Sequence, residues 1–194
     1  MLSPFKWETC STLESRSYTC GYCGNYLASE KGWVGYTPAG PKLVQFIYLC
    51  HHCQKPTFFD SSGRQTPGAS YGNSVKDIPK DVEALYNESR NSTSCNAYTA
   101  SVLCCRKLLM NIAVSKGATE GLKFIEYIEF MANKNFIPPD GKDWVDHIRT
   151  KGNEATHEIT IMKSEEPEEL IDFIEMLLKF IYEFPATIKR RSTN

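Results

Sequence analysis

The chain has 194 residues, of which 41% are hydrophobic and 23% are charged, and its formal net charge is −1. This length allows one ordinary domain or a small domain followed by a medium one, and the composition is sufficient for a hydrophobic core. The near-neutral charge excludes the global basic field that promotes binding to nucleic acid or to anionic membranes, but it is compatible with a local basic patch.

The sequence contains no stretch near the roughly 18 consecutive apolar residues of a membrane span. Residues 1–17 also lack the basic start and following apolar stretch of a secretory signal. We therefore expect a cytoplasmic protein with no membrane partner. In that compartment, the eight cysteines indicate metal ligands and buried thiols rather than disulfides.

Residues 42–49 are rich in branched and aromatic side chains and predict a strand that leads directly into a pair of cysteines. Residues 33–36 are expected to form its antiparallel partner, with residues 37–41 as the connecting turn. A polar, glycine-rich connector follows at residues 61–73. Beyond residue 75 the periodicity is helical, and the sequence has no evident internal repeat.

The helical part predicts a small bundle of about five helices. The start and stop signals of these helices are capping residues, glycines and prolines. The expected helices cover residue 79 to about 90, a cap around Ser94 to near Gly117, a cap at Thr119 to before Pro138, about 142 to 157, and Ser164 to before Pro185. Acidic residues at the start of the last helix and basic residues just beyond its end suit the helix dipole.

Two C-x-x-C pairs carry the strongest chemical signal. Cys20 and Cys23 form the first pair, Cys50 and Cys53 form the second, and 26 residues separate the pairs. Two intervening residues let a tight turn direct both thiolates at one ion, and four thiolates make a closed tetrahedral site whose usual occupant is zinc. We expect one structural Zn²⁺ and no chemistry at the metal.

The metal site completes the expected organisation, which is of the α+β class. A small β zinc ribbon covers residues 1–60, a linker covers 61–77, and an all-α bundle covers 78–190. Structural zinc contributes on the order of 10 kcal/mol or more to folding, which suits a segment with few aliphatic core residues. A redox dithiol is the alternative role for the cysteine pairs.

The remaining candidate ligands have simpler interpretations. His51 and His52 could each replace a cysteine as a metal ligand, but the two pairs already complete a shell of four. Cys10 is interpreted as a bystander. Cys95, Cys104 and Cys105 lie at or within a helical pattern, and we interpret them as small core residues.

A polar stripe marks the expected fourth helix. Arg149, Asn153 and His157 recur every four residues and would lie along one face of a continuous helix. Together they could clamp a phosphate, with the imidazole as general acid or base. They could equally bond to neighbouring helices as structural groups, and Gly152 with Asn153 could end the helix.

Arg106 lies within the otherwise apolar second helix, where a charge needs a partner. Glu154 and Glu158 are the candidate partners if the second and fourth helices pack together.

Three segments of the helical part resemble a bacterial family of uncharacterised domains in the HEPN superfamily of helical bundles. These segments are Ala100–Leu109, Ile148–His157 and Ile181–Pro185, and the resemblance covers about residues 78–186. Members of that family are often fused to restriction-type enzymes or to an N-terminal zinc ribbon, an arrangement that fits the whole chain.

The resemblance implies a metal-independent endoribonuclease of a toxin or antiphage system, with a composite site across a homodimer of the helical domain. Arg149, Asn153 and His157 would be its catalytic residues. His157 would assist attack by the 2′-hydroxyl or protonate the leaving group, and Arg149 would stabilise the phosphorane. Arg149 and His157 have seven residues between them, a longer spacing than the family motif, in which the histidine follows its arginine more closely.

Two functional hypotheses remain open. The first is a nucleic-acid-directed module of a prokaryotic or phage defence system that binds RNA or DNA, with positive charge from Lys31, Lys42, Lys55 and Arg64. The second is a non-catalytic interaction protein that binds a partner protein of such a system. The motif spacing and the net charge favour a binding role over catalysis.

Overall fold

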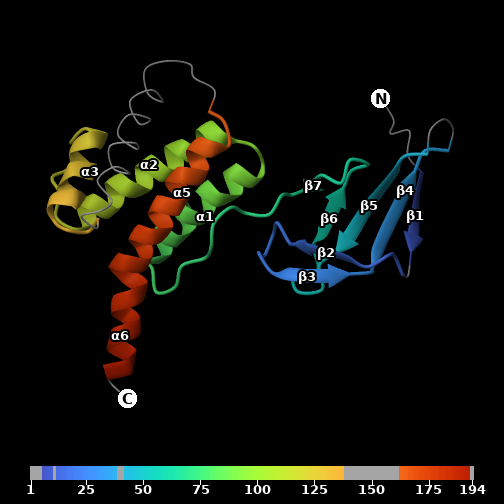
Figure 1. Cartoon of the computed structure of the whole chain (residues 1–194), viewed down its shortest axis with the longest axis horizontal. Coiled ribbons are helices and arrows are strands. Elements are labelled where there is room, and N and C mark those ends of the chain that lie inside the picture. Colours follow the sequence, from blue (N-terminus) through green and yellow to red (C-terminus); the bar gives the residue numbers. More distant parts are fainter. Residues whose placement is uncertain (1–5, 11, 39–41, 138–161, 193–194) are drawn as a thin grey trace. The chain divides into compact units, whose positions relative to one another are not determined.

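The computed structural model describes residues 6–10, 12–38, 42–137 and 162–192. The chain divides into two compact units, residues 1–70 and residues 71–194. The fold class is α+β, with antiparallel strands in the first unit and helices in the second (Figure 1). Within the described ranges, none of the helices combines the length and the apolar character of a membrane span.

The N-terminal unit contains a five-stranded antiparallel sheet of order β1-β4-β5-β6-β7 and a separate hairpin, β2-β3. The strands are β1 (Lys6–Cys10), β2 (Arg16–Thr19), β3 (Tyr26–Ser29), β4 (Gly32–Tyr36), β5 (Val44–Leu49), β6 (Pro56–Phe59) and β7 (Gln65–Thr66). The predicted strand at 42–49 and its partner at 33–36 are confirmed as β5 and β4, with Tyr36 opposite Val44.

The core of the N-terminal unit is small and aromatic. Its buried residues are Leu13, Tyr18, Cys20, Leu27, Tyr48, Cys50 and Phe59. The Phe59 ring meets the rings of Tyr18 and Tyr48 edge-on, with centroid distances of 5.3 and 5.8 Å. Because only five of the seven are not cysteines, the cysteine side chains form a substantial part of this core.

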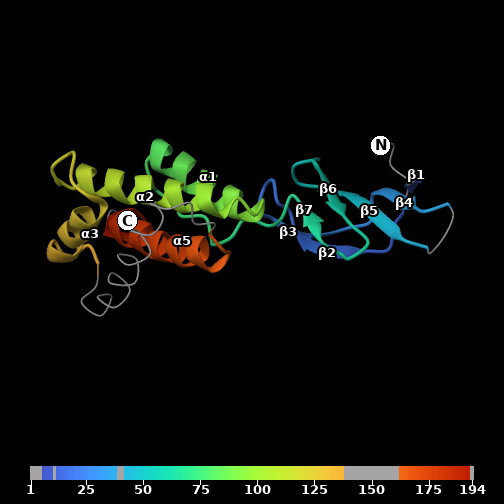
Figure 2. The ribbon, with the colours of Figure 1, turned by 90° about the horizontal axis from the view of Figure 1, so that it is seen from above.

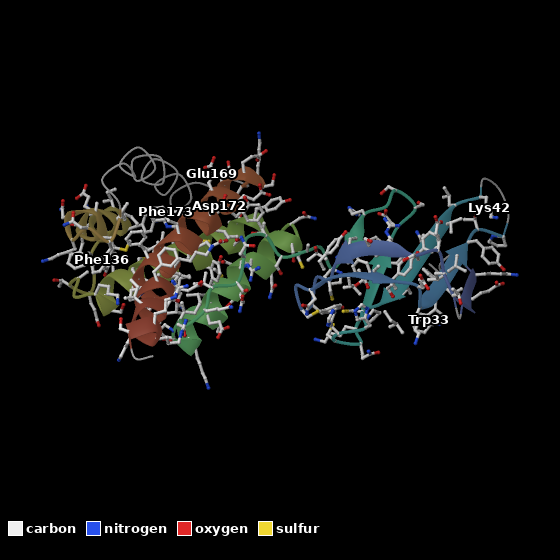
Figure 3. All side chains as sticks on the ribbon, turned by 60° about the horizontal axis from the view of Figure 1, so that its bottom comes forward. Trp33, Lys42, Phe136, Glu169, Asp172 and Phe173 are labelled. Carbon is white, nitrogen blue, oxygen red and sulfur yellow. The ribbon has the colours of Figure 1, made fainter. Side chains whose placement is uncertain are left out.

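The helical unit is built around α2, which packs against α1, α3 and α5 (Figure 2). Its elements are α1 (Lys80–Ser94), α2 (Tyr98–Ser115), α3 (Phe124–Asn133), α5 (Glu165–Leu178), a π-helical turn η2 (Lys179–Glu183) and α6 (Phe184–Ser192). The apolar face predicted for the second helix is confirmed, since Val102, Leu109 and Ile112 are buried. On α5, the Phe173 ring is fully buried while the neighbouring Asp172 is exposed (Figure 3).

Two predicted helix starts are wrong. Ser94 does not cap the second helix but lies in the last turn of α1, where its hydroxyl donates to the Asn91 carbonyl. Thr119 does not cap the third helix, which begins at Phe124 with the Lys123 amide donating to the Glu126 carboxylate. In both cases a hydroxyl residue lies near the expected boundary, but the backbone turns several residues later.

The last helix does not stop before Pro185 as predicted. It begins at the expected Ser164–Glu165 position and continues through η2 into α6, which ends at Ser192. Because α6 begins at Phe184, Pro185 occupies its first turn, where a missing backbone N–H is tolerated. The basic Lys189, Arg190 and Arg191 therefore form the last turn of α6 rather than lying beyond a helix.

The segment that leads into α1 is fixed to α5 by a buried carboxylate. The amide of Asn73 donates to Glu175 over 2.7 Å, its side chain donates to the same group over 3.0 Å, and Lys179 forms an ion pair with it. Burial alone would raise the pKa of Glu175, but Lys179 and Asn73 outweigh it and lower that pKa. Residues 61–77, expected as a linker, thus include β7 in the first unit and this anchored segment in the second.

The expected fourth helix at 142–157 lies outside the described residues. Arg149, Asn153, His157, Glu154 and Glu158 lie there as well.

Candidate metal centre

Four cysteines from two distant parts of the N-terminal unit come together. The Sγ atoms of Cys20, Cys23, Cys50 and Cys53 all lie within 4.8 Å of one another. The Sγ atoms of Cys20 and Cys53 are 3.7 Å apart, and those of Cys23 and Cys50 are also 3.7 Å apart. We call this group the cysteine cluster.

Each pair of cysteines sits on a turn that we call a knuckle, residues 20–24 and 50–54. In the first knuckle, the Cys20 amide donates to the Asn25 carbonyl and the Cys20 carbonyl accepts from Gly24. In the second, Cys50 makes the same two bonds with Lys55 and Gln54, and the corresponding lengths agree within 0.1 Å. The two knuckles therefore present their sulfurs in the same local geometry.

The glycines of the first knuckle have different physical roles. Gly24 adopts φ +71°, a left-handed conformation that Gln54 also adopts in the second knuckle at φ 59°. Gly21 is required by close packing instead. A Cβ at Gly21 would lie 2.3 Å from the Gly68 carbonyl oxygen and 2.5 Å from that of Pro67. The sequence suggested that both glycines ease the turn, but only Gly24 does so through its backbone conformation.

The cluster treats its thiols unequally. Cys20 and Cys50 are fully buried, Cys53 is half-buried and Cys23 is exposed. Burial raises the pKa of Cys20 to about 12 and also raises that of Cys53. Burial opposes ionisation of Cys23 too, but hydrogen bonds from Asn25 and the neighbouring thiols outweigh it and lower its pKa to about 7. A bound cation would offset the cost of ionising the buried thiols.

Asn25 is a functional residue that the sequence analysis missed. Its side-chain amide donates to the Cys23 sulfur over 3.4 Å, and its carbonyl accepts from the Cys20 amide. The available signal was its position, two residues after a cysteine, where a polar side chain can turn back toward the sulfur.

His51 and His52 lie on the second knuckle, exposed to solvent, with ring centroids 4.4 Å apart. Neither belongs to the group of candidate metal ligands found among the described residues, which consists of the four cysteines.

The geometry of the cluster fits a tetrahedral metal ion. Four sulfurs placed about 2.3 Å from a central ion at the corners of a tetrahedron are roughly 3.8 Å from one another, and the two shortest observed distances are 3.7 Å. These distances are far longer than the roughly 2.05 Å of a disulfide. The cysteine cluster could therefore hold a metal such as zinc.

The remaining cysteines differ from one another. Cys105 is fully buried in α2, as predicted, and burial raises its pKa to about 12. Cys104 is half-buried and Cys95 is exposed just beyond α1, so the prediction of a core position is wrong for Cys95. Cys10 is the last residue of β1.

Arg106 is buried in α2 and its guanidinium carbon lies 4.4 Å from the centroid of the Phe124 ring. Burial lowers its pKa. The ring face favours the cation electrostatically, so an aromatic contact joins the electrostatic environment that the sequence predicted for this charge.

The fold and the site define a two-unit α+β protein with a four-cysteine cluster suited to a metal ion and a separate helical unit. The chain belongs to the family described as "Domain of unknown function (DUF4145)", which matches residues 87–193. This range begins within α1 and excludes the cysteine cluster. No curated protein and no solved structure is similar to the chain.

Proposed function

We propose that the protein is a zinc-stabilised binding module, in which a zinc ribbon recognises a partner and the helical unit completes the assembly. The 3.7 Å spacing within the cysteine cluster carries this proposal, because it suits one tetrahedral ion. Thiolate ligands favour zinc over magnesium, calcium or manganese. Four protein ligands leave no open position for water, so the zinc is structural.

The metal test is direct. The purified chain is expected to contain one zinc per molecule by elemental analysis, and Cys50→Ser should lose it. Cys95→Ser is the matched control, because Cys95 is exposed and lies outside the cysteine cluster. Metal-free wild-type protein with a folded N-terminal unit would refute the proposal.

The charge of the ribbon favours a protein partner over nucleic acid. Residues 1–70 contain six Lys or Arg and four Asp or Glu, a formal charge of +2. Four thiolates around Zn²⁺ carry −2, so the zinc-loaded unit is neutral. Binding to phosphates depends strongly on positive charge, and this unit has no net excess of it.

Nucleic acid is a second candidate because of aromatic groups beside the first knuckle. Tyr22 and Tyr26 are 49% and 74% exposed, and the Lys55 ammonium lies 4.9 Å from the Tyr22 ring centroid. Exposed rings beside a cation are typical of surfaces on which single-stranded bases stack. Fluorescence anisotropy with a labelled uridine oligonucleotide tests this: Lys55→Ala should weaken binding more than Arg64→Ala, which removes the same charge from an exposed turn.

For the helical unit, we propose the HEPN-like bundle, the homodimer and the role in a prokaryotic or phage defence system that the sequence resemblance implies. If the bundle cleaves RNA, Arg149, Asn153 and His157 carry the reaction. RNA incubated without divalent metal, with wild type, Arg149→Ala and His157→Ala, tests this. Cleavage lost in both folded variants would establish the nuclease, and no cleavage by wild type would leave the binding role.

A further inference from the structure

The two knuckle hairpins are repeated copies of one arrangement, although no repeat is evident in the sequence. Every residue pair of β2-β3 has a counterpart in β5-β6 that lies 30 residues later in both strands. Arg16 opposite Ser29 corresponds to Phe46 opposite Phe59, and the same holds for the other pairs. The hydrogen bonds of the two knuckles follow the same offset. The N-terminal unit therefore has an approximate internal symmetry.

Beside the second hairpin, the outer edge of β6 is covered by the chain itself. β7 pairs with it, with Thr66 opposite Phe58 and Gln65 opposite Phe59. The Gln65 side chain also donates to the Thr19 carbonyl over 2.8 Å. The chain then continues over Gly21, as the close approach of Pro67 and Gly68 requires. This covering segment thus rests on four residues: Phe58, Phe59, Thr19 and Gly21.

The symmetry-equivalent location is an open groove. Subtracting or adding 30 converts those four residues into Ala28, Ser29, Leu49 and His51, and all four line a cavity of about 480 Å³. Glu30 and Gln54 are among the other lining residues. We call this cavity the β3 groove. A volume of this size lies within the range of roughly 300–1,000 Å³ that is common for ligand sites.

The chain path explains why only one of the two grooves is filled. After β6 the chain turns back at residues 60–64 and lays β7 beside it. After β3 it instead enters β4, which pairs with β1 and β5. Within the described part of the unit, β2 is therefore the one strand that pairs with β3.

The backbone of β3 is oriented to accept another strand. In an antiparallel ladder, alternate residues direct their N–H and C=O groups toward the same neighbour. The Cys20 amide bonds to the Asn25 carbonyl, which sets the phase of the β2-β3 ladder. Tyr26 and Ala28 then direct their backbone groups away from β2, as Phe58 directs its own toward β7. Ala28 thus presents a donor and an acceptor to the β3 groove.

Two differences restrict what the groove can hold. Ser29 donates to the Leu49 carbonyl over 2.8 Å, so the equivalent of the Gln65 contact is made internally. His51 replaces Gly21, and its side chain occupies the space that Pro67 and Gly68 cross on the other side. An occupant therefore needs a small residue beside His51 or an end at that point.

We infer that the β3 groove binds an extended segment of a partner protein, which adds as an antiparallel strand to β3 through backbone hydrogen bonds with Ala28. The occupant of the equivalent groove is itself an extended polypeptide, and strand addition to an open sheet edge is an established mode of peptide recognition. The neutrality of the zinc-loaded unit also favours a peptide over nucleic acid. This inference rests on the proposed zinc-stabilised ribbon and identifies its recognition surface and partner class.

The test uses the whole zinc-loaded chain as bait for a displayed library of random heptapeptides. Peptides selected on wild type should bind Ala28→Pro at least about tenfold more weakly, since proline removes the N–H that faces the groove and blocks strand addition. In NMR titrations, they should shift the amides of residues 28–31 and His51. His51→Gly recreates the glycine of the first knuckle, so it should gain affinity for the heptapeptide of residues 64–70, which fills the equivalent groove.

Zinc content and the NMR spectrum of each bait are measured first. A bait without zinc and without a folded ribbon contradicts the proposed function itself. A folded, zinc-loaded bait that selects no peptide, or whose peptides bind Ala28→Pro equally or shift amides elsewhere, overturns only the β3 groove. Binding of a uridine oligonucleotide at residues 28–31 would also overturn it, in favour of nucleic acid.

Discussion

Removal of the metal should unfold one unit of the chain and leave the other folded. The perturbation is a chelator strong enough to strip zinc from the cysteine cluster of the whole 194-residue chain. The N-terminal unit depends on that cluster, because two of its seven fully buried core residues, Cys20 and Cys50, are themselves cluster members.

The expected magnitude follows from the two cores. Burying an apolar side chain contributes about 1.5–3 kcal/mol, so the five other buried residues of the N-terminal unit contribute on the order of 10 kcal/mol. Structural zinc contributes roughly 10–16 kcal/mol at neutral pH, which is comparable with that entire apolar core. The helical unit has 22 buried core residues and is independent of the metal, so it should retain its structure.

The assay combines circular dichroism with amide NMR spectra before and after chelation. Helical circular dichroism should persist, while the dispersed amide signals of residues 12–38 and 42–70 collapse to random-coil positions and return when zinc is added. Cys95→Ser, with an exposed thiol outside the cluster, should respond as wild type does. Dispersed signals from the N-terminal unit after verified removal of the metal would refute the reasoning.

Other predictions concern the glycines of the first knuckle and the buried carboxylate of α5. Gly21→Ala should destabilise the ribbon by about 1–3 kcal/mol through the clash with Gly68, and Gly24→Ala by about 1–2 kcal/mol through its backbone conformation alone. Asparagine tolerates the left-handed region, so Gly24→Asn should be milder than Gly24→Ala while Gly21→Asn stays severe; thermal unfolding of the zinc-loaded chain separates the two causes. Glu175→Gln should cost the helical unit about 1–3 kcal/mol in denaturant unfolding, because charge-assisted bonds to Asn73 are lost. Since the folded-state pKa of Glu175 is lowered, wild type should lose this contribution as pH falls below about 4.3 and on through that lowered value, whereas Glu175→Gln should lack this part of the acid dependence; identical acid limbs would contradict the role given to the carboxylate.

Local patterns predicted those parts of the fold that depend on neighbouring residues. β5 was evident because six branched or aromatic residues are concentrated in one short stretch, and the α2 face was evident because its apolar residues recur with the helical period. β1 was missed, since Lys6–Cys10 contains a single large apolar side chain, Trp7, and is held by its pairing with β4. The starts of α2 and α3 were misplaced because hydroxyl residues near a boundary look alike whether or not they cap it.

The sequence by itself determined the candidate metal centre, because a C-x-x-C pair is a local turn whose spacing fixes where both sulfurs point. It also determined the division into a strand-rich part and a helical part, which follows from periodicity. Only the tertiary structure decided the purpose of Gly21, the placement of β7 beside β6, the anchoring of Asn73 by Glu175 and the open edge of β3. These features join residues separated by more than 40 positions, or depend on where the chain goes after a strand ends, and no local pattern encodes such contacts.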